Sequence, residues 1–139
     1  MLSKEDNELL TRVGAGTPTG ELYRRYWMPL LLTEELTEAK DAPVPVRALG
    51  EDFVAFRDAS GKARIIGAKC PHRQVDLVYA RNEGCGLRCL YHGWVMDGEG
   101  RIAEMPNDPA GTVKDKISHR WCPTHEAGGI VWGYLGSPD

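Results

Sequence analysis

The sequence predicts a small all-β fold of antiparallel sheets that follows a short helical extension. Short runs of β-branched and aromatic residues alternate with turn residues from position 29 onward. Sixteen glycines and nine prolines among 139 residues supply the tight turns that such a fold needs. We therefore expect one domain over 1–139, with a helical extension over 1–28 and a β core over 29–139.

The extension contains two helix signals. Ser3 is a suitable N-cap with Asp6 three residues later, and the Gly14–Gly16 stretch ends the first helix. Thr17–Pro18 then offers a second cap followed by proline at the first helical position. We expect this second helix to stop before Pro29.

The β core is predicted from apolar runs of strand length. Turn sequences at 58–61 and 97–100 mark two hairpins, and the polar segment 33–45 is expected to be a connection. The strands expected from these patterns span residues 30–32, 46–49, 53–57, 64–68, 87–90, 94–96, 101–103 and 130–135.

Charge and hydropathy exclude several classes of partner. Seventeen basic and 20 acidic side chains give a formal net charge of −3, which does not favour nucleic acid or an anionic membrane surface. No apolar run approaches the ~18 residues that a bilayer-spanning helix needs. The polar, acidic amino terminus is unlike a secretory or transit peptide, so we expect a cytoplasmic location.

Two mixed cysteine–histidine pairs carry the chemistry. The first is Cys70-Pro71-His72, and the second, after sixteen residues, is Cys89-Leu90-Tyr91-His92. Each pair follows a β-rich run, so two hairpin-like loops can meet tip to tip and each can supply one sulfur and one nitrogen. This ligand set suits a [2Fe–2S] cluster of the Rieske type, in which two histidines replace two cysteines on one iron. We expect cluster loops at 70–76 and 89–94, with thiolates and neutral imidazoles as ligands.

Electron transfer is the function that this ligand set predicts, because such a cluster accepts and donates a single electron. Neutral histidine ligands reduce the negative charge of the cluster, which makes its reduction easier than in plant-type ferredoxins. Backbone N–H groups of both loops are expected to hydrogen-bond the cluster sulfides. Tyr91 and Trp94 are expected to donate to sulfur or to shield the site from water.

The two remaining cysteines, Cys85 and Cys122, are expected to be free thiols in a reducing cytosol. Membrane-bound Rieske proteins tie their two cluster loops with a disulfide. Here 71–76 contains no cysteine, and Cys85 lies upstream of the second ligand pair. The sequence therefore favours the soluble type.

A structural zinc-binding module is an alternative interpretation, because two cysteines and two histidines can also form a tetrahedral zinc site. Zinc fingers usually group their cysteines in one pair and their histidines in another, whereas each pair here is mixed. The four residues could also be unrelated members of the core. The pattern favours the iron–sulfur cluster over both alternatives.

The stretch from Cys70-Pro71-His72-Arg73 to Cys89-Leu90-Tyr91-His92-Gly93-Trp94 resembles the Rieske domain of ring-hydroxylating non-haem iron oxygenases. The amino terminus, with Gly16-Thr17-Pro18 and Arg24-Arg25-Tyr26-Trp27, is similar to that of phthalate dioxygenase-type oxygenase components. The resemblance implies a Rieske-type domain of three sheets. It also implies that Cys70 and Cys89 bind one iron of the cluster and that His72 and His92 bind the other.

The resemblance further implies an enzyme of several parts. Electrons would arrive from a flavin-containing NAD(P)H reductase and pass to a mononuclear Fe(II) that activates O₂ against an aromatic or related substrate. We expect the catalytic domain, with its two histidines and one carboxylate, downstream of residue 139. The 139-residue chain is then expected to transfer electrons only, and the full protein to form a trimer of oxygenase subunits. A freestanding Rieske ferredoxin is the alternative, although small ferredoxins resemble the β core alone.

One departure from the family pattern lies in the first loop. The family usually follows Cys-Pro-His-Arg with a glycine and a small residue, but Gln74-Val75 stand here. A glutamine at this position is sterically disfavoured if the loop requires a positive φ. Its side chain could instead cover the cluster sulfides.

Several other side chains are given ordinary structural roles. His119 and His125 are expected to be surface or loop residues, and Arg24-Arg25 a solvated helix face or a subunit contact. Packing in the core is expected for all four tryptophans, which are Trp27, Trp94, Trp121 and Trp132.

Overall fold

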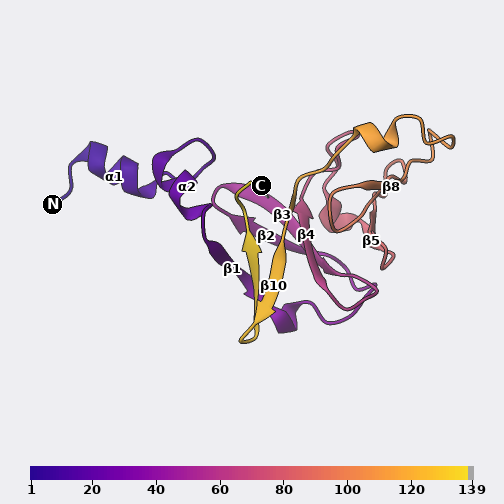
Figure 1. The fold of residues 1–139 in the computed structure, drawn as a ribbon, viewed down its shortest axis with the longest axis horizontal. Coiled ribbons are helices and arrows are strands. Elements are labelled where there is room, and N and C mark those ends of the chain that lie inside the picture. The colour runs from indigo at the N-terminus through magenta and orange to yellow at the C-terminus, as the bar shows by residue number, and fades with distance from the viewer. Residues whose placement is uncertain (138–139) are drawn as a thin grey trace.

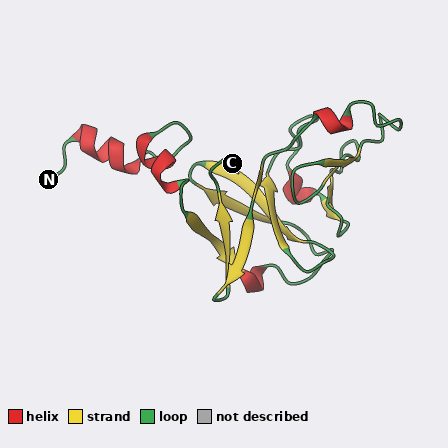
Figure 2. Cartoon of the chain, viewed as in Figure 1, coloured by secondary structure: helices red, strands yellow, loops and turns green. Residues whose placement is uncertain are grey.

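Residues 1–137 of the computed structural model form two short helices followed by three antiparallel sheets (Figures 1 and 2). The helices are α1 (Lys4–Thr11) and α2 (Pro18–Tyr23), and 3₁₀ turns lie at Thr33–Glu35, Leu77–Tyr79 and Lys114–Lys116. The strands are β1 (Trp27–Leu32), β2 (Val44–Ala48), β3 (Glu51–Arg57), β4 (Ala63–Gly67), β5 (Arg81–Asn82), β6 (Leu87–Arg88), β7 (Val95–Met96), β8 (Ile102–Glu104), β9 (Trp121–Cys122), β10 (Thr124–Ala127) and β11 (Ile130–Tyr134). The all-β prediction is confirmed.

The sheets have the strand orders β1-β11-β10, β2-β3-β4-β9 and β5-β6-β7-β8. The sheet β5-β6-β7-β8 lies at the end of the molecule away from the amino-terminal helices (Figure 1). The three-sheet architecture implied by the family resemblance is therefore present. Its middle member is the sheet that contains β3 and β4.

The central strands of the middle sheet, β3 and β4, are buried on both faces, which explains their consecutive apolar residues. Along β3, Phe53 and Ala55 pack into one apolar cluster, while Val54 and Phe56 pack into the other. Side chains of a strand alternate between the two faces of its sheet, so one strand can supply both clusters. The second cluster, with Val54 and Phe56, also contains the two cysteines of the mixed pairs.

The helical extension is attached to the β core by a charged group of three residues. Arg24 is buried, and its guanidinium donates to Glu51 at 3.0 Å and to the backbone carbonyls of Val13 and Leu49 at 2.9 and 3.0 Å. Arg120 donates to the other carboxylate oxygen of Glu51 at 3.2 Å. The expectation that Arg24 lies on a solvated helix face or at a subunit contact is therefore wrong, whereas Arg25 is exposed.

α2 ends at Tyr23, before Pro29 as expected, but Pro29 is not the residue that ends it, because Pro29 lies inside β1. Within residues 1–137, β1 pairs with β11 alone, at the edge of its sheet, and its register shifts between Pro29 and Leu31. An edge strand with a bulge tolerates proline, because the missing N–H is not needed for pairing there. The polar connection 33–45 also ends earlier than expected, at the start of β2.

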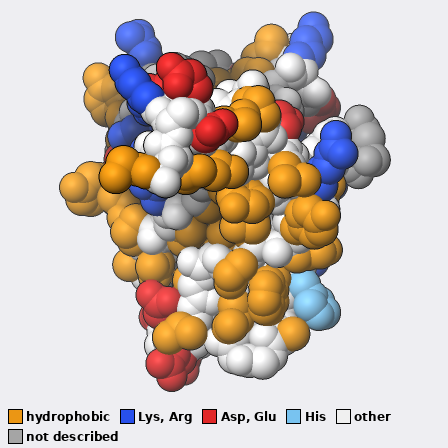
Figure 3. Space-filling view, turned by 90° about the vertical axis from the view of Figure 1, so that its left-hand side faces the viewer, with side chains coloured by type: hydrophobic (Ala, Val, Ile, Leu, Met, Phe, Trp, Pro, Cys, Tyr) orange, Lys and Arg blue, Asp and Glu red, His pale blue; other side chains and the backbone are white. Residues whose placement is uncertain are grey.

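The amino-terminal helices leave much apolar surface uncovered. No residue of α1 is buried, and Leu9 and Leu10 are about half exposed. Leu22, Tyr23 and Tyr26 continue this surface beside α2. Figure 3, which views the molecule from its helical end, shows apolar side chains spread over this face.

Candidate metal centre

The two ligand pairs lie on loops that leave neighbouring sheets. Cys70 follows β4 of the middle sheet, and Cys89 directly follows β6 of the third sheet. Both cysteines are almost fully buried, at 1% and 4% exposure, in the apolar cluster between these sheets. The fold thus places both sulfurs at the base of the site, where water is excluded.

The two loops have the same backbone hydrogen bonds. In the first, the N–H of Cys70 donates to Val75 O at 2.8 Å, and the N–H of Gln74 donates back to Cys70 O at 2.9 Å. In the second loop, the N–H of Cys89 donates to Trp94 O at 2.8 Å, and that of Gly93 donates to Cys89 O at 3.1 Å. Each cysteine is therefore held at the same place in an equivalent closed turn.

The two thiols are neighbours. The Cys89 thiol and the backbone N–H groups of His72 and Arg73 all act on the Cys70 sulfur. Burial, together with the nearby Cys89, raises the pKa of the Cys70 thiol, and the two N–H groups offset only part of this rise. A bound cation would favour the thiolate at this place, because it supplies the missing positive charge.

The two imidazoles also form a pair. The ring centroids of His72 and His92 are 4.6 Å apart with an interplanar angle of 71°. Desolvation, with smaller contributions from His92 and Arg73, lowers the pKa of His72. The neutral form that this favours is the form that ligates a metal.

Trp94 shields one side of the imidazole pair. Its ring stacks on His72 with a centroid distance of 4.5 Å and an angle of 8°. The indole N–H donates to Asn107 Oδ1 at 2.8 Å, which fixes the ring orientation. Tyr91 lies beside the exposed His92, with ring centroids 3.9 Å apart. The sequence predicts that Trp94 shields the site. It does not predict the contact with Asn107, because Asn107 lies 13 residues further along the chain in another loop.

This arrangement fits a two-iron cluster better than a single ion. A [2Fe–2S] cluster of the mixed type needs two separate ligand pairs, one of sulfur and one of nitrogen. Within residues 1–137, no group of three or more His, Cys, Asp or Glu side chains is placed to hold one metal ion. The thiol pair and the imidazole pair match the ligand set of the two-iron cluster.

The remaining histidines lie apart from this centre. His119 is partly buried, and its Nε2 lies 2.8 Å from the carbonyl of Gly67. His125 is exposed on β10. Cys85 is an exposed free thiol and Cys122 a buried one, as expected from the sequence. Burial raises the pKa of the Cys122 thiol to about 11.

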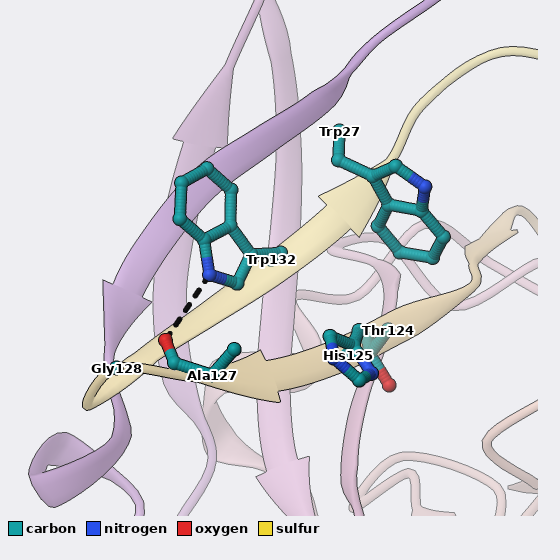
Figure 4. A pocket seen from close by; sticks show the side chains of 6 residues that line it. All are labelled: Trp27, Thr124, His125, Ala127, Gly128 and Trp132. Atoms are coloured by element: carbon teal, nitrogen blue, oxygen red, sulfur yellow. Dashed lines mark hydrogen bonds between the residues drawn. The ribbon is translucent and has the colours of Figure 1, made fainter.

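An open apolar pocket of about 610 Å³ lies on the first sheet, on strands other than those that carry the cysteine–histidine loops. Trp27, His125 and Trp132 line it from β1, β10 and β11, and the Trp132 indole donates to Ala127 O at 3.2 Å (Figure 4). Trp27 is 48% exposed, so its expected place in the core is wrong. Trp94 is buried as expected, and Trp121 packs partly buried against the core.

Comparisons with known proteins agree with this geometry. The sequence profile of the Rieske [2Fe-2S] domain matches residues 26–125. The phthalate 4,5-dioxygenase oxygenase subunit of Pseudomonas putida is 47% identical over 140 aligned residues, which cover all of this chain and 32% of that subunit. The chain belongs to the Rieske [2Fe-2S] domain family, and it spans about a third of the length of curated relatives such as this subunit.

Solved structures of oxygenases share the fold. Dicamba monooxygenase bound to dicamba is 27% identical, with a TM-score of 0.73 over 83% of this chain and 35% of that one. The oxygenase of carbazole 1,9a-dioxygenase, solved in complex with a ferredoxin, is 27% identical, with a TM-score of 0.71 over 82% of this chain and 29% of that one. No helix within residues 1–137 is long and apolar enough to cross a bilayer.

Proposed function

We propose that Cys70 and Cys89 bind one iron of a Rieske [2Fe–2S] cluster and that His72 and His92 bind the other. The observation that carries this assignment is the pairing of thiol with thiol and imidazole with imidazole on two loops of equivalent backbone. When bound, the cluster supplies one-electron redox chemistry. The chain is then an electron-transfer domain.

The protein residues have separate tasks in this proposal. The buried cysteines hold their end of the site in apolar surroundings, which excludes water and protects acid-labile sulfide. His92 is exposed, so the histidine end faces solvent and an approaching redox partner. Trp94 covers the face of His72 and restricts its rotation. The route for the electron is therefore through the imidazole end.

For the whole protein, we propose an oxygenase of the ring-hydroxylating class. This domain would pass single electrons from a flavin-containing NAD(P)H reductase, directly or through a ferredoxin, to a mononuclear non-haem iron in a separate catalytic domain. Support comes from the relatives, which are oxygenase subunits, and from the carbazole 1,9a-dioxygenase oxygenase–ferredoxin complex. A trimer of oxygenase subunits and a cytoplasmic location belong to the same proposal, with an aromatic compound as substrate.

The freestanding ferredoxin is less well supported. The alignment with the phthalate 4,5-dioxygenase oxygenase subunit includes the helical extension, because it covers the entire chain. Arg24 and Glu51 attach this extension to the β core. A helical extension held in this way agrees with an oxygenase domain rather than with a β core alone.

Iron and acid-labile sulfide analysis tests the ligand assignment. The purified protein is expected to contain two of each per chain and to show a visible spectrum that dithionite bleaches. Alanine substitution of Cys70, His72, Cys89 or His92 should abolish the cluster, because metal binding is coupled to folding. Cys85→Ala and His125→Ala are matched controls that remove the same residue types elsewhere and should retain it. Full cluster content in any of the four ligand variants would refute the assignment of that residue.

A further inference from the structure

Arg88 precedes Cys89, and its guanidinium is held in one orientation by two carboxylates. Nε and Nη2 donate to the two oxygens of Glu83 at 2.8 and 2.9 Å, and Nη2 also donates to Glu104 at 2.6 Å. The Arg88 and Glu83 side chains are only 23% and 22% exposed. A bidentate, partly buried pair of this kind fixes the orientation of the guanidinium as well as balancing its charge. The guanidinium is therefore oriented by residues that lie outside the second cluster loop.

The third nitrogen of this guanidinium contacts the cluster loop itself. Nη1 donates to the backbone carbonyl of Gly93 at 2.8 Å. Gly93 is the residue between His92 and Trp94, and its φ of 77° lies in the left-handed region. Arg88 thus connects the turn that follows His92 to Glu83 beside β5 and to Glu104 at the end of β8.

The second loop needs this restraint more than the first. The His72 ring stacks on Trp94, which limits its movement directly. The His92 ring is exposed, and its ring contacts with Tyr91 and His72 lie within the two cluster loops, so its position depends on the backbone that carries it. The Gly93 carbonyl is the point where a side chain from outside the loop holds that backbone.

We propose that Arg88 is a positioning residue of the electron-transfer centre. By holding the Gly93 carbonyl, it fixes the backbone between His92 and Trp94, and with it the place of the His92 imidazole on its iron and of the indole against His72. This inference rests on the proposed function, because it assumes the cluster. It concerns the geometry and retention of the cluster rather than the identity of its ligands.

Lys69 provides a matched control in the first loop. It precedes Cys70 as Arg88 precedes Cys89, and its ammonium donates to Asp76 at 3.0 Å. The Lys69 and Asp76 side chains are 53% and 35% exposed. Exposed ion pairs of this kind restrain little. Lys69→Arg therefore exchanges the same two residue types at the equivalent position and also preserves charge.

The test compares Arg88→Lys with Lys69→Arg in the holoprotein. Lysine keeps the charge, but its single ammonium does not reproduce the planar fork that reaches Glu83, Glu104 and Gly93 together. We expect Arg88→Lys to lose iron to a chelator about tenfold faster, in line with other residues that support metal ligands. We also expect a shifted reduction potential and a broadened EPR spectrum of the reduced cluster. Lys69→Arg should match the wild type in all three measurements.

Each outcome separates the two proposals. If wild-type protein holds no [2Fe–2S] cluster, the proposed function fails. If it holds one and Arg88→Lys retains wild-type iron loss, potential and spectrum, only the positioning role is overturned. If Arg88→Lys does not fold, Glu104→Gln replaces it, because Glu104 is 56% exposed and the substitution weakens one of the two carboxylate contacts that orient the Arg88 guanidinium. Glu104→Gln should then change the potential and the spectrum in the same direction, and wild-type values would overturn the inference.

Discussion

Gln74 and Gly93 occupy equivalent positions in the two cluster loops. Each lies four residues after its cysteine, donates its N–H to that cysteine's carbonyl, and adopts a positive φ, 62° for Gln74 and 77° for Gly93. The site is therefore built from one backbone turn used twice. At this position the first loop has a glutamine side chain, whereas the second loop has glycine.

Replacement of Gln74 by glycine should stabilise the protein. A left-handed φ costs a residue with a Cβ about 1 kcal/mol, and the greater backbone freedom of glycine in the unfolded chain offsets part of this gain. We expect the free energy of unfolding of Gln74→Gly to rise by about 0.5 kcal/mol. Denaturant unfolding of the holoprotein measures it.

Gln74→Ala is the control for that change. It removes the side-chain hydrogen bond from Gln74 Nε2 to Cys70 O, at 3.3 Å, but keeps the Cβ and its strain. Equal stability of the glycine and alanine variants would show that φ strain is not the cause.

Gly93→Ala should have the opposite effect in the second loop. A Cβ there carries the φ penalty and also lies 3.3 Å from Cγ of Pro106. We expect a loss of about 1–2 kcal/mol in the free energy of unfolding. Gly128→Ala is the matched control, because φ is 62° there and nothing lies within 4 Å of the added Cβ. If Gly93→Ala costs no more than Gly128→Ala, the close packing of the loop on Pro106 is not important for stability.

The Glu51 group should make attachment of the helical extension sensitive to acid. Burial raises the pKa of Glu51, but hydrogen bonds from Arg120 and Arg24 outweigh it and lower the pKa below its ordinary 4.5. A lowered carboxyl pKa means that the stabilisation is present above pH 4.5 and is lost as the pH falls through the folded value. The hydrogen-exchange protection factors of residues 1–26, which are corrected for the pH dependence of intrinsic exchange, should therefore fall below pH 4.5.

Glu51→Gln removes this titration. At neutral pH it should lower the free energy that attaches the extension to the β core by about 2 kcal/mol, because the ion pair is partly buried. It should also flatten the acid dependence of hydrogen-exchange protection. Asp52→Asn disrupts the exposed Arg47–Asp52 pair and serves as the control, with an expected change below about 0.5 kcal/mol. An acid response that persists in Glu51→Gln would point to another carboxylate.

The two free thiols outside the loops should differ in reactivity. At pH 8, an alkylating reagent should modify exposed Cys85 and leave Cys122 unmodified, because burial hides Cys122 and raises its pKa to about 11. Mass spectrometry of the folded holoprotein reads both sites in one experiment. Modification of Cys122 at the rate of Cys85 would indicate that the first and middle sheets separate readily.

The candidate ligand pairs can be identified in the sequence because each is a short local motif. Two short motifs, each after an apolar run, identify two loops without knowledge of the sheets. The conformational cost at Gln74 can also be predicted, because a glycine at this position in the family implies a positive φ. Gln74 has a positive φ in the structure. The roles of Arg88 and Asn107 have no such signal, because no sequence motif marks the contact of Arg88 with the Gly93 carbonyl or that of Asn107 with Trp94.

The remaining differences also come from tertiary contacts. Arg24 is polar in sequence but becomes buried because Glu51 lies opposite it. Trp27 is apolar but stays exposed on the outer face of β1. Pro29 stops helices in general, yet an edge strand with a bulge accepts it. Local pattern cannot distinguish these cases.

Pulsed EPR of the reduced holoprotein tests the central claim most directly, because it detects nitrogen nuclei bound to the paramagnetic cluster. We predict couplings from two imidazole nitrogens, which disappear with the cluster in His72→Ala and His92→Ala and remain in His125→Ala. A cluster signal without nitrogen coupling, or a colourless protein that contains one zinc ion, would contradict the assignment of His72 and His92 to a shared iron.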